Sequence, residues 1–127
     1  MKSKTVAQVF SASKSEVFDY FSKIDNLPKW ATEFCKELKT VDGKHKVVTP
    51  MGELFINFSV DKKTGVIDMF AGPTEDQMAP APTRVVGLGD KKSVYLFTFF
   101  QTPDLSDEVF EGQHEALKKE LANAKIS

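Results

Sequence analysis

The sequence predicts one α+β domain in which a curved antiparallel sheet wraps around a long C-terminal helix, with two short helices after the first strand. Residues 13–38 show the spacing of two amphipathic helices directly after one strand-like segment. Residues 40–101 then favour strands, and residues 106–125 show the spacing of one closing helix. A sheet that holds a helix in this way surrounds an apolar interior, so we expect an internal cavity.

The composition limits the classes of partner. The 127 residues, 41% of them hydrophobic, are enough for one domain that buries roughly two thirds of its unfolded surface. The 17 basic and 18 acidic residues are spread evenly, so no basic stripe is present and we expect no nucleic-acid partner. No segment approaches the roughly 20 apolar residues of a membrane span, and the N-terminus lacks the apolar run of a signal peptide. We therefore expect a cytoplasmic protein without a membrane span.

Metal and cofactor motifs are missing from the sequence. Cys35 is the single cysteine, which excludes an internal disulfide and a cysteine-based zinc site, and we expect a buried, inert thiol. The two histidines, His45 and His114, lie in different predicted elements without a regular spacing of carboxylates beside them. No nucleotide-binding glycine loop, G-x-S-x-G elbow or H-E-x-x-H helix occurs. The sequence therefore predicts no metal site and no cofactor.

The first three elements follow from capping and apolar spacing. Residues 5–11 are rich in residues that favour strands. Ser13 and Glu16 have the S-x-x-E spacing of a capping box, so a helix begins there. Asp25 or Asn26 then caps a second helix with a proline in its first turn. The two predicted apolar stripes are Val17, Tyr20, Phe21 and Ile24 in the first helix, and Leu27, Trp30, Ala31, Phe34 and Leu38 in the second.

A period of two predicts the sheet. Three antiparallel strands are expected at residues 41–50, 52–60 and 66–70, and in the second of them Leu54, Ile56, Phe58 and Val60 face the interior while Asn57 faces solvent. Three prolines in residues 71–83 indicate a loop or a broken edge strand. Two further strands are expected at residues 84–88 and 93–101.

The end of the chain predicts a helix that packs on this sheet. Residues 93–101 are apolar on both faces, which is typical of a central strand or of one whose outer face meets another element or another copy of the chain. Asp104 or Ser106 caps the last helix, with acidic residues in its first turn. Its apolar stripe contains Phe110, Leu117, Leu121 and Ala124, and His114 falls inside the same stripe.

This order of elements resembles the START-like helix-grip superfamily, also called SRPBCC, which includes the polyketide cyclase/dehydrase and lipid-transport group and the birch-pollen-allergen-like proteins. The resemblance covers residues 4–125, which we expect to form one domain. It rests on VFDYFSKIDNLPKWA at 17–31, GVID at 65–68 and SDEVFEGQHEALKKELANAK at 106–125. It implies a cavity between the sheet and the long helix. It does not name the guest, because members bind, carry or transform very different molecules.

The aromatic composition indicates what the cavity prefers. Eleven phenylalanines against two tyrosines and one tryptophan bring few hydrogen-bonding groups, so we expect an apolar or aromatic guest. The candidate ligand-binding residues are Trp30, Phe34, Phe58, Arg84, Phe97, Phe110 and His114. Trp30 lies either in the core or at the cavity mouth. Arg84 either holds an acidic head group with its planar guanidinium or bridges surface carboxylates.

Two residues are candidates for proton transfer. His114 lies in an apolar stripe, where an imidazole against the cavity can transfer protons; the alternative, which the sequence favours slightly, is a core histidine bonded to a strand carbonyl or a carboxylate. Asp68 stands between apolar neighbours in its strand. If it faces inward, it must be paired, for example with Arg84 or His114, or have a raised pKa; if it faces outward, it is solvated. His45, between two lysines beside a turn, is expected on the solvated surface.

Three functions remain open at this point. The first is a binding or carrier domain for a small apolar or aromatic ligand. The second is a polyketide cyclase/dehydratase-like enzyme that uses His114 or Asp68 for proton transfer. The third is a protein-interaction module that uses the outer face of the strand containing Tyr95, Phe97 and Phe99; self-association as a homodimer would be its first sign.

Overall fold

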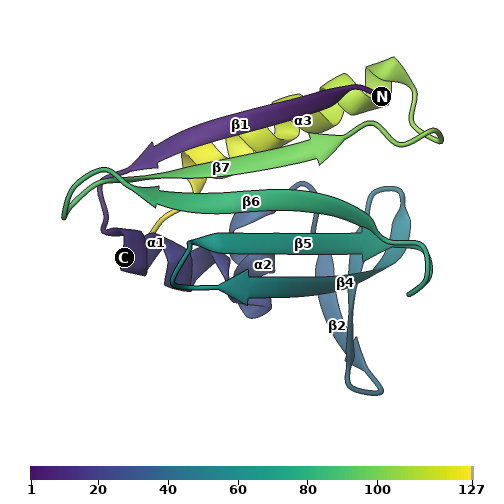
Figure 1. Ribbon diagram of the computed structural model, residues 1–127. Helices are drawn as coiled ribbons and strands as arrows, with labels where there is room; N and C mark the ends of the chain where they lie inside the picture. The colour runs from purple at the N-terminus through teal and green to yellow at the C-terminus, as the bar shows by residue number, and fades with distance from the viewer. Residues whose placement is uncertain (127) are drawn as a thin grey trace.

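The computed structural model describes residues 1–126 and contains one antiparallel sheet of seven strands in the order β1-β7-β6-β5-β4-β3-β2. The helices pack on the same side of this sheet, with α3 behind β1 and β7 (Figure 1). The strands are β1 (Ser3–Phe10), β2 (Glu37–Val41), β3 (Lys44–Thr49), β4 (Gly52–Asp61), β5 (Val66–Gly72), β6 (Ala79–Gly87) and β7 (Ser93–Phe100), and the helices are α1 (Lys14–Phe21), the 3-10 turn η1 (Ile24–Asn26), α2 (Leu27–Trp30) and α3 (Asp107–Asn123). The predicted fold class is therefore confirmed.

Helix α1 begins where its capping box predicts. The Ser13 hydroxyl accepts a hydrogen bond from the Glu16 amide at 3.1 Å, and the Glu16 carboxylate accepts one from the Ser13 amide at 3.2 Å. Two backbone donors that the first turn cannot satisfy are thus satisfied reciprocally. The predicted stripe residues Val17 and Phe21 are fully buried against the sheet.

The second helix is shorter than predicted. It ends at Trp30, because Ala31 leaves the helical region with φ −89° and ψ 54°. Phe34 lies in the segment that follows, and Leu38 lies in β2, where it pairs with Val47. The helical spacing of Phe34 and Leu38 is therefore coincidental, since one lies in a turn and the other in a strand.

A buried carboxylate on α3 explains why the helix stops early. Glu120 has only 5% of its surface exposed, and one of its oxygens accepts hydrogen bonds from the backbone amides of Glu33 and Phe34, both at 3.0 Å. These two amides are thereby satisfied without a continuing helix. Cys35 is buried beside them, as predicted, and burial together with the nearby Glu120 charge raises the pKa of its thiol.

The predicted strand at residues 41–50 is in fact the second half of a hairpin. Strands β2 and β3 are joined by Asp42 and Gly43, whose φ angles are 53° and 76°. Two residues with positive φ form the tight turn whose twist suits two antiparallel strands, and Asp-Gly is a preferred pair for it. The sequence predicts Asp42-Gly43 near the start of one strand, whereas in the structure this dipeptide forms the turn between β2 and β3.

The proline-rich segment is a loop, as predicted, only at residues 73–78, and its last residues begin strand β6. Pro80 and Pro82 lie in β6, where they pair with Phe70 and Asp68 of β5. Strand β6 pairs with β7 only from Thr83 onward, so both prolines precede the point where β6 and β7 come together. Figure 1 shows the two strands separating at this end.

The direction of the backbone explains how β6 tolerates these prolines. The amide of Val85 donates to the carbonyl of Gly65 at 2.8 Å, on the β5 side of the strand. Because alternate residues of an antiparallel strand direct their amides to opposite neighbours, Pro80 and Pro82 direct their nitrogens toward β7. Strand β7 has already separated there, so no ladder hydrogen bond is lost.

Aromatic rings fill the space between the sheet and the helices. Phe21 of α1 stacks on Tyr95 of β7 with ring centroids 4.0 Å apart, and Trp30 meets Phe21 edge-on at 5.1 Å. The contacts continue along the inner face of β7 and reach Phe110 of α3 through the pairs Tyr95–Phe97, Phe97–Phe99 and Phe99–Phe110. The phenylalanine-rich interior is thus in large part packed against itself.

Tyr95 stabilises the core through the stacking of its ring and not through its hydroxyl. The residue is fully buried, and its hydroxyl makes no hydrogen bond of normal geometry with residues 1–126. The nearby Thr83 hydroxyl donates to the Ile67 carbonyl at 2.6 Å. Burial raises the pKa of Tyr95, and the Thr83 hydroxyl offsets only part of that effect.

We expect Tyr95→Phe to leave the free energy of unfolding unchanged or slightly higher, because it removes a buried hydroxyl that lacks a good partner. Tyr95→Ala, the matched control, should lose about 3–5 kcal/mol because it removes the ring that stacks on Phe21. Urea unfolding of both variants measures these effects. A loss of more than about 1 kcal/mol in Tyr95→Phe would show that the hydroxyl bonds to Thr83 favourably.

Glu120 makes stability depend on pH in a defined direction. Burial raises the pKa of its carboxyl above the ordinary value of 4.5, although the amides of Phe34 and Glu33 offset part of this shift. The folded state therefore holds this proton to higher pH than the unfolded state does, and the associated stabilisation is lost as pH rises from about 4.5 through the folded pKa.

In Glu120→Gln the side-chain oxygen still accepts from the two amides but no longer titrates. We expect the stability of the wild type relative to this variant to fall as pH rises through that window and then to level off. Urea unfolding at a series of pH values measures the difference. A difference that rises with pH would mean that the amides lower the pKa more than burial raises it.

Candidate functional site

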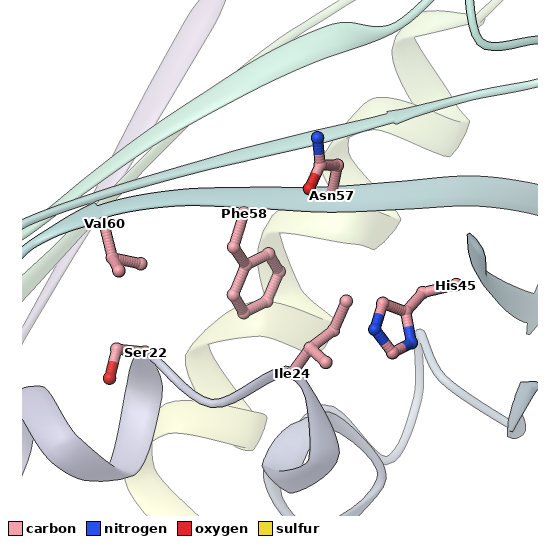
Figure 2. Close-up of a pocket in the computed structure, with 6 residues that line it drawn as sticks. All are labelled: Ser22, Ile24, His45, Asn57, Phe58 and Val60. Atoms are coloured by element: carbon pink, nitrogen blue, oxygen red, sulfur yellow. The ribbon is translucent and has the colours of Figure 1, made fainter. Parts of the chain in front are cut away.

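A pocket of about 200 Å³ opens to solvent on the inner face of the sheet, where η1 faces strands β3 and β4 (Figure 2). We call it the inner pocket. It is lined by Ser22, Ile24, His45, Asn57, Phe58 and Val60. It lies beside the aromatic core, and none of the rings stacked around Tyr95 lines it.

The apolar wall of the inner pocket comes from two sides. Ile24 of η1 and Phe58 of β4, both half-buried, point toward the same space in Figure 2. Val60 lies at the rim and is 48% exposed. Phe58 and Val60 alternate with Asn57 along β4, and the Asn57 side chain points away from Phe58, as the sequence predicts.

His45 and Ser22 supply the polar groups. His45 is half-buried in β3, and its Nδ1 lies 3.4 Å from the hydroxyl of Thr40, its partner across the β2–β3 hairpin. The prediction that His45 lies on the solvated surface is correct only in part, because its side chain is half-buried in a pocket that opens to solvent. His45 stands two residues before the fully buried Val47, so strand alternation directs both side chains to the inner face. This alternation is the sequence signal that could have identified it.

Most of the aromatic candidates belong to the core. Trp30 is 3% exposed and meets Phe97 at a centroid distance of 6.3 Å, while Phe110 is fully buried against Phe99. Phe34 is half-buried in the turn that Glu120 holds. Of the aromatic candidates, Phe58 is the one that lines the inner pocket.

His114 lies apart from the inner pocket. It is half-buried on α3, with its ring centroid 6.4 Å from that of Phe99. No hydrogen bond to its ring occurs among residues 1–126, so neither the carbonyl nor the carboxylate partner considered from the sequence is present there. The structure therefore does not bring His114 and His45 into one site.

Asp68 and Arg84 lie on the outer face of the sheet, opposite to the helices. Asp68 alternates with the buried Ile67 and Met69, which face the core. Arg84 is exposed, and its Nε donates to the Thr64 carbonyl at 3.3 Å. The sheet therefore separates Asp68 from His114, so the inward pairing considered from the sequence does not form.

A second hollow, of about 290 Å³, lies on this outer face near the point where β6 and β7 separate. We call it the outer hollow. It is lined by Thr5, Val66, Asp68, Pro82, Thr83, Arg84, Leu96 and Thr98. The rings of Tyr95, Phe97 and Phe99, which define the strand considered for protein contacts, face the helices instead.

Comparison with known proteins identifies the architecture. No protein-family model matches the chain, and no curated protein matches it in sequence. Solved structures do match. The chain has the helix-grip fold. XoxI from Bacillus cereus has a TM-score of 0.71 and 18% identity over 95% of this chain and 93% of its own. The Zhui aromatase/cyclase from Streptomyces sp. R1128 has a TM-score of 0.70 and 11% identity over 94% and 90%.

A third neighbour extends the range of this fold. Ara h 8.0201 has a TM-score of 0.58 and 16% identity over 94% of each chain. The resemblance to the START-like superfamily that the sequence shows is therefore confirmed at the level of fold. At these identities the likeness establishes the architecture alone, and the function must be argued from the site.

Two further findings concern residues 1–126. No helix there is long and apolar enough to cross a membrane. No group of three His, Cys, Asp or Glu side chains within this part of the chain is arranged to hold a metal ion.

Proposed function

We propose that the protein is a binding or carrier domain for a small apolar or aromatic ligand, which it holds in the inner pocket. The observation that carries this proposal is the composition of the pocket wall. Ile24, Phe58 and Val60 offer apolar contact, and His45 offers a hydrogen-bonding group at one side. Binding sites for small molecules combine mainly apolar walls with a few placed polar groups.

The volume limits the size of the ligand. Pockets for drug-sized molecules measure about 300–1,000 Å³, whereas an apolar cavity of about 150 Å³ accommodates benzene. A pocket of about 200 Å³ therefore suits a molecule with one ring or two fused rings, or a short branched chain. A hydroxyl or carboxylate on that molecule would face His45.

The fold supports the proposal in a general way. One neighbour of the same fold is named an aromatase/cyclase, and this name agrees with an aromatic ligand. The alternative of a cyclase/dehydratase-like enzyme that uses His114 or Asp68 for proton transfer has less support, because neither residue lines the inner pocket. A catalytic role for His114 alone would lack a partner for its proton among residues 1–126.

Native mass spectrometry of the purified protein, followed by nuclear magnetic resonance titration with indole and 2-naphthol, tests this function. We expect Ile24→Trp to weaken probe binding at least tenfold, because the larger ring occupies the pocket. Val109→Trp, on the exposed surface of α3, is the matched control and should bind as the wild type does. Equal binding by Ile24→Trp would exclude the inner pocket, and the absence of both a retained molecule and probe binding would overturn the proposed function.

His45 should select ligands that carry a hydroxyl. We expect His45→Ala to weaken 2-naphthol binding about 2- to 12-fold, which corresponds to one hydrogen bond of 0.5–1.5 kcal/mol, and to leave naphthalene binding unchanged. Fluorescence titration with both probes measures the difference. An equal loss for the two probes would mean that the imidazole contributes packing rather than a hydrogen bond.

A further inference from the structure

The outer hollow has an apolar floor where the sheet faces away from every helix. Leu96 of β7 and Val66 of β5 are half-buried there, and Pro82 of β6 is exposed at its edge. Along β7 the outward residues Val94 and Phe100 extend this half-buried apolar surface. Strand β7 lies between β1 and β6, as expected if its apolar pattern marks a central strand, and no helix of residues 1–126 covers its outer face.

Two opposite charges stand beside this floor without pairing to each other. Asp68 pairs in register with Pro82, and Arg84 pairs with Val66, so the two charged residues are diagonal neighbours on the same face. None of the ion pairs within 4.0 Å among residues 1–126 joins them or includes either one. Diagonal neighbours across two strands lie about 7–8 Å apart, within reach of a long side chain, but the Arg84 side chain bonds to the Thr64 carbonyl instead.

The two charged groups are held in place differently. The Nε of Arg84 donates to the Thr64 carbonyl, which orients the side chain and leaves its two terminal nitrogens free to bind a carboxylate. Asp68 is half-buried on the surface of the sheet, and its carboxylate accepts no hydrogen bond from residues 1–126. Each group therefore keeps its capacity for a partner of opposite charge.

We propose that the outer hollow is the centre of a self-association surface that binds a second copy of this chain about a twofold axis. An axis that lies in the plane of contact and passes between Asp68 and Arg84 brings each Asp68 opposite the Arg84 of the other copy. One symmetric contact then forms two ion pairs, because a twofold interface joins residue i to j and j to i. The apolar floor around Leu96 becomes buried in the same contact.

A second copy fits these observations better than a small ligand does. The hollow is open rather than enclosed, and its acidic and basic groups are equal in number and adjacent, so the surface is complementary to itself. The exposed parts of these charges are screened by salt, so self-association should weaken as ionic strength rises. The inner pocket lies on the opposite face of the sheet, so this proposal is independent of the proposed function.

Charge reversal with mixing tests the proposal. We expect sedimentation equilibrium to detect dimers of the wild type, and D68R and R84D each to raise the dimer dissociation constant at least tenfold, because each homodimer then opposes like charges twice. An equimolar mixture of D68R and R84D should regain dimers, since both contacts between the two variants join opposite charges. Asp90→Arg, in the exposed turn before β7, is the control with the same change of net charge and should dimerise as the wild type does.

Each other outcome is decisive. A wild type that stays monomeric up to millimolar concentration would overturn the proposal, and so would dimers that D68R and R84D leave unchanged. Circular dichroism checks that each variant folds. If a reversal variant does not fold, D68N and R84Q replace it; each should weaken its own homodimer, and mixing them should regain part of the loss, because the mixed dimer restores one of the two ion pairs. Ile24→Trp should dimerise normally, whatever it does to probe binding.

Discussion

The carboxylate of Glu120 ties the long helix α3 to residues 31–36, the segment between α2 and β2. The position of this segment sets how the chain passes from the helices into the sheet. The amides of Glu33 and Phe34 donate to this carboxylate, so they are satisfied although the segment is not helical. Helix α2 therefore stops at Trp30, and the chain enters β2 only seven residues later. The 3-10 turn that places Ile24 opposite β4 lies directly before α2. The arrangement leaves a buried carboxyl with a raised pKa, which a neutral amide acceptor would avoid.

The aromatic core decides where an internal space can remain. The sequence predicts a cavity between the sheet and the long helix, but rings already pack there, because Phe97 and Phe99 of β7 continue the aromatic core from Tyr95 to Phe110 of α3. The space that the structure offers lies to one side, under β3 and β4, where smaller and half-buried side chains meet. Phenylalanine content thus indicates an apolar interior and does not distinguish a lined cavity from a filled one.

Local sequence rules predicted the elements whose signals are short-range. The capping box at Ser13 and the alternation along β4 were sufficient, because both depend on residues within a few positions. The second helix could not be delimited, since its end depends on Glu120, 87 residues further along the chain from Glu33. The position of β6 likewise depended on where β7 separates from it. The face that His45 occupies was predictable from Val47, whereas the outward direction of Asp68 required the register of β5.

The separation of β6 from β7 has a consequence for the behaviour of the chain in concentrated solution. A gap in a sheet exposes backbone groups to which a foreign strand can add, and such edges promote fibrous aggregation. At this gap Pro80 and Pro82 present two nitrogens that carry no hydrogen. An incoming strand would find no donors at these positions, so its own carbonyls would lose water without gaining partners. The two prolines that lie at the opening therefore protect it against amyloid-like growth.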